Sequence, residues 1–161
     1  MRGMSRQSEE TGTDAGPQLS SRLGYLFKHV QQALAEVTTP VLARFDLTGR
    51  ELAVLIVLDG LGPASQQEAA RGLAVDRTTM VALLDGLEAK GIVARRPAEQ
   101  DRRRNLVELT AQGRETFAAA LTASDDAEHA FVAGVMDDER AAEFKAHLLA
   151  LITRQRAVPE R

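Results

Sequence analysis

The feature that most restricts the possible folds is a change of hydrophobic period at Gly91. Before Gly91, apolar residues recur at three- and four-residue spacing, which is typical of amphipathic helices. After it, 92–96 and 106–109 have the length and composition of two short strands, and a polar, arginine-rich segment separates them. The chain is therefore predicted to be mainly α-helical, with one small β-hairpin that follows a group of helices.

A long amphipathic helix is expected at the start of the ordered chain. Residues 1–18 are polar and lack periodicity, so they are predicted to form a disordered tail. From residue 19 to residue 45, apolar residues form one helical face. Pro40 lies inside this stretch and is expected to kink or interrupt the helix, because proline lacks a backbone N–H donor.

Three capping signals divide the next stretch into helices over 48–60, 65–72 and 76–90. Each helix begins with a residue whose side chain can accept from first-turn N–H groups: Thr48, Ser65 and Asp76. Thr48 and Ser65 are each followed three residues later by glutamate, which is the spacing of a capping box. The side chains expected to be buried are Leu52, Leu55 and Ile56 in the first helix, and Met80, Leu83, Leu84 and Leu87 in the last.

Two more helices are predicted after the hairpin. Thr110 can cap the first, and Asp137 can cap the second. The first helix carries Phe117, Leu121 and Phe131, and the second carries Phe144, Leu148, Leu151 and Ile152. On a small domain the second set would form an exposed apolar stripe, so a second copy of the chain is expected to cover it.

Charge is distributed unevenly along the 161-residue chain, which has a net charge of −3. Residues 90–104 contain six basic and two acidic side chains, so this segment is +4. A locally basic segment on an acidic body fits the binding of a polyanion, and it equally fits a solvated loop. The chain has no cysteine, which excludes disulfides and thiol redox sensing, and no apolar run approaches the length of a membrane span.

The order of the predicted elements points to nucleic acid. Two helices joined by a short turn at 72–75 are a candidate helix-turn-helix, although many helical cores contain such a pair. The basic hairpin that follows strengthens the interpretation. A helix can read base edges in the major groove, and an arginine from a neighbouring hairpin can enter the adjacent minor groove.

Three segments of the sequence resemble the MarR family of bacterial transcriptional regulators. They are VDRTT at 75–79, LEAKGIV at 87–93, and DRR at 101–103 with LT after it. The resemblance extends over about residues 19–155. It implies a winged helix-turn-helix domain at 47–110, a helical dimerisation region at 19–46 and 111–156, and a homodimer that binds a pseudo-palindromic operator in double-stranded DNA.

The resemblance assigns roles to individual residues. Asp101 and Arg103 match the acidic–x–arginine pair of the family's hairpin, in which the acid orients the arginine toward the minor groove. The other expected DNA-binding residues are Gln66, Gln67, Arg77, Thr78, Thr79, Val81, Ala82, Arg102 and Arg104. Many relatives carry polar or basic residues where this chain has Val81 and Ala82. The helix is therefore expected to make few direct hydrogen bonds to base edges. For Arg77, Thr78 and Thr79, which open the helix, the alternative is plain capping and solvation, and for Arg103 it is a free surface arginine.

A ligand site is expected on the first long helix. Arg22, Tyr25 and His29 have i, i+3 and i+7 spacing, which places them on one face. A cation, a phenol and an imidazole can together hold an aromatic carboxylate, and members of the family often bind aromatic or phenolic acids. The alternative is that all three lie half-exposed at the edge of the dimer core. No metal site or cofactor is predicted, because His129 and His147 have no partners at metal-ligand spacing.

The function predicted from the sequence is that of a cytoplasmic, dimeric transcriptional repressor, released from DNA by a small aromatic or phenolic ligand. A winged helix used for protein–protein contact is the second hypothesis. An enzyme is not predicted, because the chain lacks a glycine-rich phosphate loop and a cluster of catalytic side chains.

Overall fold

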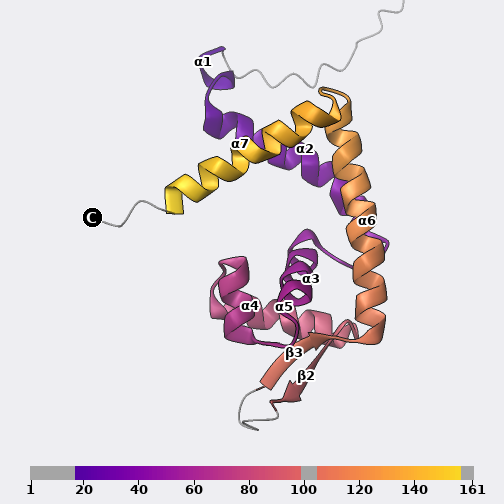
Figure 1. Ribbon diagram of the computed structural model, residues 1–161. Helices are drawn as coiled ribbons and strands as arrows, with labels where there is room; N and C mark the ends of the chain where they lie inside the picture. Colours follow the sequence, from indigo (N-terminus) through magenta and orange to yellow (C-terminus); the bar gives the residue numbers. More distant parts are fainter. Residues whose placement is uncertain (1–16, 99–104, 157–161) are drawn as a thin grey trace, which may run out of the picture. The chain divides into compact units, whose positions relative to one another are not determined.

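The computed structural model describes residues 17–98 and 105–156. The described elements are α1 Pro17–Ser20, α2 Leu23–Ala43, α3 Gly49–Leu61, β1 Ala64–Ser65, α4 Gln66–Leu73, α5 Arg77–Ala89, β2 Val93–Pro97, β3 Asn105–Leu109, α6 Ala111–Ala133 and α7 Asp138–Arg156 (Figure 1). The chain divides into two units within α2, one up to Ala33 and the other from Leu34 onward. The predicted fold class, mainly α-helical with a small β-hairpin, is confirmed.

The helix predicted over 19–45 differs from the observed one at its start and at its end. The chain forms a single turn, α1, and breaks at Ser21, whose hydroxyl donates to the carbonyl of Gln18 over 3.2 Å. The carbonyl of Arg22 then accepts from the N–H of Leu26, which begins α2. Pro40 does not interrupt α2, which continues to Ala43. The proline costs one N–H donor of the backbone ladder, and the helix ends three residues later.

The predicted caps of the central helices are confirmed. Thr48 and Glu51 form a complete capping box at α3, and Ser65 forms the same arrangement at α4. Asp76 caps α5 by accepting from the N–H of Thr79. Between α4 and α5 the backbone passes through Ala74 in the left-handed conformation, with φ 54°. The turn therefore reverses the chain in three residues and brings the starts of α4 and α5 onto one surface.

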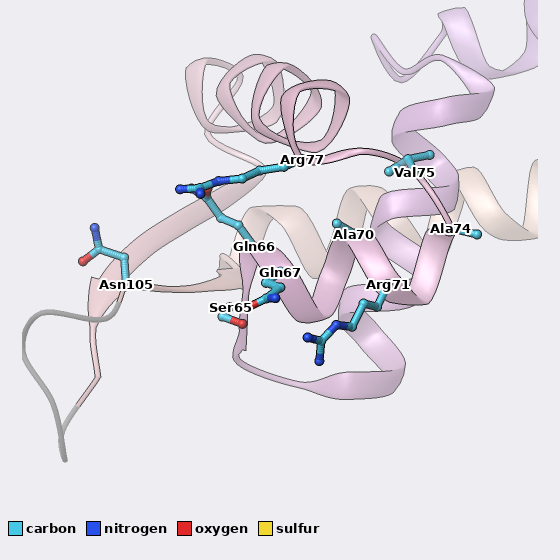
Figure 2. Close-up of a pocket in the computed structure, with 9 residues that line it drawn as sticks. All are labelled: Ser65, Gln66, Gln67, Ala70, Arg71, Ala74, Val75, Arg77 and Asn105. Carbon is cyan, nitrogen blue, oxygen red and sulfur yellow. The ribbon is translucent and has the colours of Figure 1, made fainter.

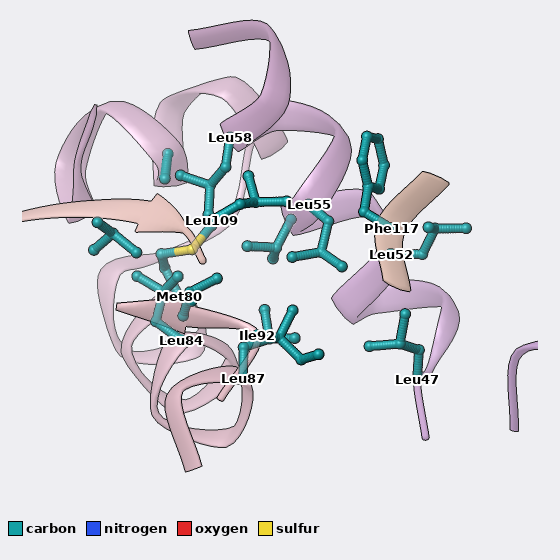
Figure 3. Packing of buried hydrophobic residues seen from close by; sticks show 14 of the residues in the cluster. Leu47, Leu52, Leu55, Leu58, Met80, Leu84, Leu87, Ile92, Leu109 and Phe117 are labelled. Atoms are coloured by element: carbon teal, nitrogen blue, oxygen red, sulfur yellow. The ribbon is translucent and has the colours of Figure 1, made fainter. Parts of the chain in front are cut away.

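The core of the second unit lies between α3, α4, α5, the start of α6 and the sheet. Its largest fully buried side chains include Leu55, Leu58, Met80, Leu84 and Leu87 (Figure 3). The sequence placed Ile56 in this core, but its side chain is 47% exposed. At 100° per residue it falls just outside the arc of α3 that carries the buried side chains, which include Val54 and Leu58.

The sheet has three antiparallel strands in the order β1–β3–β2. The hairpin pairs from Val93 with Leu109 to Pro97 with Asn105. The strand β1 was not predicted, because a strand of two residues is too short to show alternation. This strand pairs Ala64 with Val107, so the segment before α4 is fixed to the hairpin.

The end of the hairpin is fastened to α6 around Gly113. The hydroxyl of Thr110 accepts from the N–H of Gly113 over 2.9 Å, and the N–H of Thr110 donates to the carbonyl of Ile92 over 3.0 Å. A Cβ atom on Gly113 would lie 1.9 Å from that carbonyl oxygen. Such an overlap with backbone atoms cannot be relieved by a side-chain movement, so this junction requires glycine.

Candidate nucleic-acid interface

The exposed face of α5 is the first part of the candidate interface. Met80, Leu84 and Leu87 are fully buried, so the period of the helix turns the opposite face toward solvent. The predicted DNA-binding residues of α5 are placed as follows: Thr78 and Ala82 are exposed on that face, Val81 is half-buried beside it, and Arg77 is exposed in the first turn. Beyond its first turn, the hydrogen-bonding side chain on this face is that of Asp85, which is also exposed.

Capping determines which polar groups at the start of α5 remain available. The Thr79 hydroxyl donates to Asp76 over 2.6 Å, and the Thr79 N–H donates to the same carboxylate over 2.9 Å. These two hydrogen bonds lower the pKa of Asp76, so the cap is ionised at neutral pH. Thr79 thus serves the cap, whereas Arg77 forms no ion pair or hydrogen bond with any other described residue.

A hollow of about 620 Å³ lies between α4, the turn and the hairpin. Its lining residues are Ser65, Gln66, Gln67, Ala70, Arg71, Ala74, Val75, Arg77 and Asn105. Figure 2 shows the side chains of Gln66 and Arg77 extending toward the side of the hollow where the hairpin residue Asn105 lies. The structure therefore brings the predicted residues Gln66, Gln67 and Arg77 to one concave surface.

The predicted hairpin-tip residues Asp101, Arg102, Arg103 and Arg104 lie outside the described residues. The described strands end at Pro97 and Asn105, which pair with each other at the edge of the hollow. The roles of the four tip residues therefore stay predictions from the sequence.

Three basic residues of the 90–104 segment are neutralised within the protein. Lys90 contacts Glu51, with 2.8 Å between Nζ and Oε1, and Arg96 contacts Glu108, with 2.8 Å between Nε and Oε1. Arg95 forms ion pairs with Asp85 and Glu88 of α5. The net charge of the segment therefore overstates the positive charge that its described residues offer to a polyanion, whereas Arg77 of α5 has no such partner among the described residues.

Lys90 joins the end of α5 to the segment between α2 and α3. Its ammonium donates to the carbonyl of Asp46 over 2.6 Å as well as to Glu51. Glu51 also accepts from the N–H and the hydroxyl of Thr48, over 2.8 and 2.9 Å. Burial by itself would raise the pKa of Glu51, but the hydrogen bonds from Lys90 and Thr48 and the charge of Lys90 lower it below its ordinary value.

The predicted ligand residues lie in the first unit and are only partly brought together. The rings of Tyr25 and His29 are in contact, with 4.2 Å between their centroids and 46° between their planes. Both side chains are half-buried. Arg22 precedes α2 and is exposed, and no described residue pairs with it. The structure thus shows an aromatic pair with an arginine one turn away along the chain.

In the described ranges, 17–98 and 105–156, no helix is both long enough and apolar enough to cross a membrane. The same ranges contain no group of three or more His, Asp or Glu side chains placed to hold a metal ion.

Comparisons with known proteins give a consistent result. A family model described as the MarR family matches residues 45–104. The HTH-type transcriptional repressor NicR from Pseudomonas putida is 30% identical over 95 residues, 59% of this chain, and the match spans 60% of that protein's length.

Two solved structures extend the similarity over most of the chain. The transcriptional repressor CouR, bound to a 23-mer DNA duplex, is 33% identical with a TM-score of 0.76, covering 85% of this chain and 96% of that one. CouR from Rhodococcus jostii RHA1, bound to p-coumaroyl-CoA, is 25% identical with a TM-score of 0.70. The match covers 83% of this chain and 93% of that one.

The buried ion pair between Glu51 and Lys90 predicts a pH-dependent stability. Glu51→Gln should lower the free energy of unfolding at neutral pH by about 1–3 kcal/mol, because the amide cannot replace the charged partner of Lys90. The pKa of Glu51 is lowered from 4.5, so its contribution is complete above that pH and is lost as the pH falls further. Thermal unfolding between neutral and acid pH should show the two proteins converging below about pH 4.5.

The control is Glu68→Gln, which changes the exposed capping box of α4. Its effect should be smaller than that of Glu51→Gln at neutral pH. A difference between wild type and Glu51→Gln that stays constant down to the lowest pH would contradict the role given to this ion pair.

Proposed function

The chain belongs to the MarR family, and on that premise we propose that it is a dimeric, sequence-specific DNA-binding transcriptional repressor that a small aromatic or phenolic ligand releases from DNA. The observation that carries the proposal is the exposed start and outer face of α5 beside a β-hairpin, with Arg77 free of partners among the described residues. A DNA-bound relative of the same fold supports it.

In this proposal α5 is the recognition helix and enters the major groove. Arg77 and Thr78 approach base edges or phosphates, and Val81 and Ala82 contact thymine methyl groups. Gln66 and Gln67, at the start of α4, donate to phosphate oxygens. Because α5 offers few hydrogen-bonding groups, much of the specificity falls to the hairpin tip, where Arg103, oriented by Asp101, reads minor-groove shape. Arg102 and Arg104 contact the backbone.

Dimerisation is proposed through α2, α6 and α7, within the ranges 19–46 and 111–156. The outer surfaces of α2 and α7 carry large exposed apolar side chains, which include Leu23, Phe27 and Val30 on α2 and Leu149, Leu151 and Ile152 on α7. Exposed apolar faces of this kind mark interfaces rather than solvated helices. A second copy of the chain covers them, and the winged domain at 47–110 of each subunit then meets one half of an operator.

Ligand release is proposed to involve Tyr25, His29 and Arg22. The aromatic pair supplies a flat surface and the arginine supplies a cation, which together suit an aromatic or phenolic ligand. A relative of the same family binds p-coumaroyl-CoA, a phenolic thioester. The ligand acts by binding more tightly to a dimer whose recognition helices are wrongly spaced for DNA.

DNA binding is tested with the duplex that the wild-type protein enriches from a random pool, titrated over a range of salt concentrations. Affinity should fall steeply with salt, because bound cations of the DNA are displaced by basic side chains. Arg77→Ala and Arg103→Ala should each weaken binding about tenfold or more, or reduce the salt slope by about one. Arg140→Ala, at an exposed position in the first turn of α7, is the charge-matched control and should change neither. Failure to enrich any duplex would refute the proposal.

Ligand release is tested by calorimetry with p-coumaroyl-CoA and p-coumarate, with and without the enriched duplex. A tenfold loss of DNA affinity corresponds to about 1.4 kcal/mol of coupling, and DNA must weaken ligand binding by the same factor. Arg22→Ala should bind the ligand more weakly, and Lys28→Ala on the same helix should not. Equal binding by the Arg22→Ala variant would exclude this site.

A further inference from the structure

Arg95 is the one described residue of β2 that binds the recognition helix through both its backbone and its side chain. Its guanidinium forms ion pairs with Asp85 and Glu88, and its backbone N–H donates to Glu88 over 3.3 Å. The side chain of Arg95 is only 19% exposed. Burial by itself would lower its pKa, but the hydrogen bonds that the guanidinium donates to the two carboxylates raise it, so the guanidinium is charged at any working pH.

The acidic partner Asp85 lies on the face of α5 that the proposed function turns toward DNA. It follows Val81 and Ala82 by one helical turn, and its side chain is 59% exposed. An unpaired carboxylate there would repel phosphates. Pairing with Arg95 removes that charge and, at the same time, holds the hairpin against the C-terminal half of the helix.

Direct contact between Arg95 and DNA does not fit this geometry. Both terminal nitrogens of the guanidinium are already engaged, NH1 by Glu88 and NH2 by Asp85. The adjacent Arg96 is different, since its partner Glu108 belongs to the paired strand and leaves Arg96 41% exposed. Two neighbouring arginines of one strand therefore have different connections, one to the helix and one within the sheet.

We infer that Arg95 is a positioning residue, which together with Asp85 and Glu88 fixes the orientation of the hairpin relative to the recognition helix and so determines sequence specificity. The inference rests on the proposed function. A dimer that reads the major groove with α5 and the minor groove with the hairpin needs a fixed angle between them. When that angle is loose, binding to any DNA persists through phosphates, but the match to one sequence is lost.

The experiment compares Arg95→Gln with Arg96→Gln, which remove the same charge from adjacent positions. Affinity is measured for the duplex enriched by the wild-type protein, of the length bound in the CouR complex, and for a scrambled duplex of the same composition. The ratio of the two affinities should fall roughly fivefold to tenfold for Arg95→Gln. Arg96→Gln should weaken binding to both duplexes alike and leave the ratio unchanged.

The opposite charge change provides the second arm. Asp85→Asn with Glu88→Gln removes two negative charges near DNA, so electrostatics alone would strengthen binding to both duplexes. Loss of the clamp should instead lower the ratio, because the scrambled duplex gains affinity and the enriched duplex does not. Asp85→Asn alone, at an exposed position, gives a mild variant if the double substitution fails to fold.

The outcomes separate this inference from the proposed function. The clamp is supported if the ratio of the two DNA affinities falls in both arms and thermal unfolding shows that the variants are folded. An unchanged ratio in Arg95→Gln and in the acidic variants, while the wild type remains selective, overturns the clamp alone. A wild-type protein without selectivity for any duplex overturns the proposed function itself.

Discussion

Burial of one side of α5 is the constraint from which the rest of the structure follows. Met80, Leu84 and Leu87 are completely buried, and α5 packs against α3, α4 and β2. With that side fixed, the helical period determines which residues face solvent, and the Asp76 cap determines where the helix begins. The exposed face, the hollow beside it and the hairpin next to it are all consequences of how this one helix is packed.

Ion pairs connect the C-terminal half of α5 to neighbouring elements. Lys90 joins it to Glu51 and the carbonyl of Asp46, and Asp85 and Glu88 join it to Arg95 of the hairpin. Each of these bonds connects elements distant in sequence or in different layers of the fold. The acidic character of the chain therefore has a structural use, since part of it neutralises basic residues that would otherwise appear available to DNA.

Local signals made much of this fold predictable. The caps at Thr48, Ser65, Asp76 and Thr110 are confirmed because each depends on residues at most three positions apart. The two-residue strand β1 and the exposure of Ile56 were not predicted, since pairing with a distant strand and the edge of the buried arc depend on tertiary packing.

The candidate site was predictable in part for the same reason. The family resemblance assigned Gln66, Gln67 and Arg77 to DNA binding, but the sequence could not show that Arg95 and Lys90 are neutralised. The partners of these ion pairs are distant in the sequence, and Glu51 and Lys90 are 39 positions apart. The requirement for glycine at position 113 was also not predicted, because it comes from the close approach of the Ile92 carbonyl and not from a turn.

Hydroxyl-radical footprinting on the enriched duplex is the sharpest test of whether two copies of this winged domain bind DNA together, with α5 in the major groove. We expect two protected regions related by a dyad, with centres about one helical turn or a small multiple of it apart. A single protected region, or uniform protection along the duplex, would contradict it.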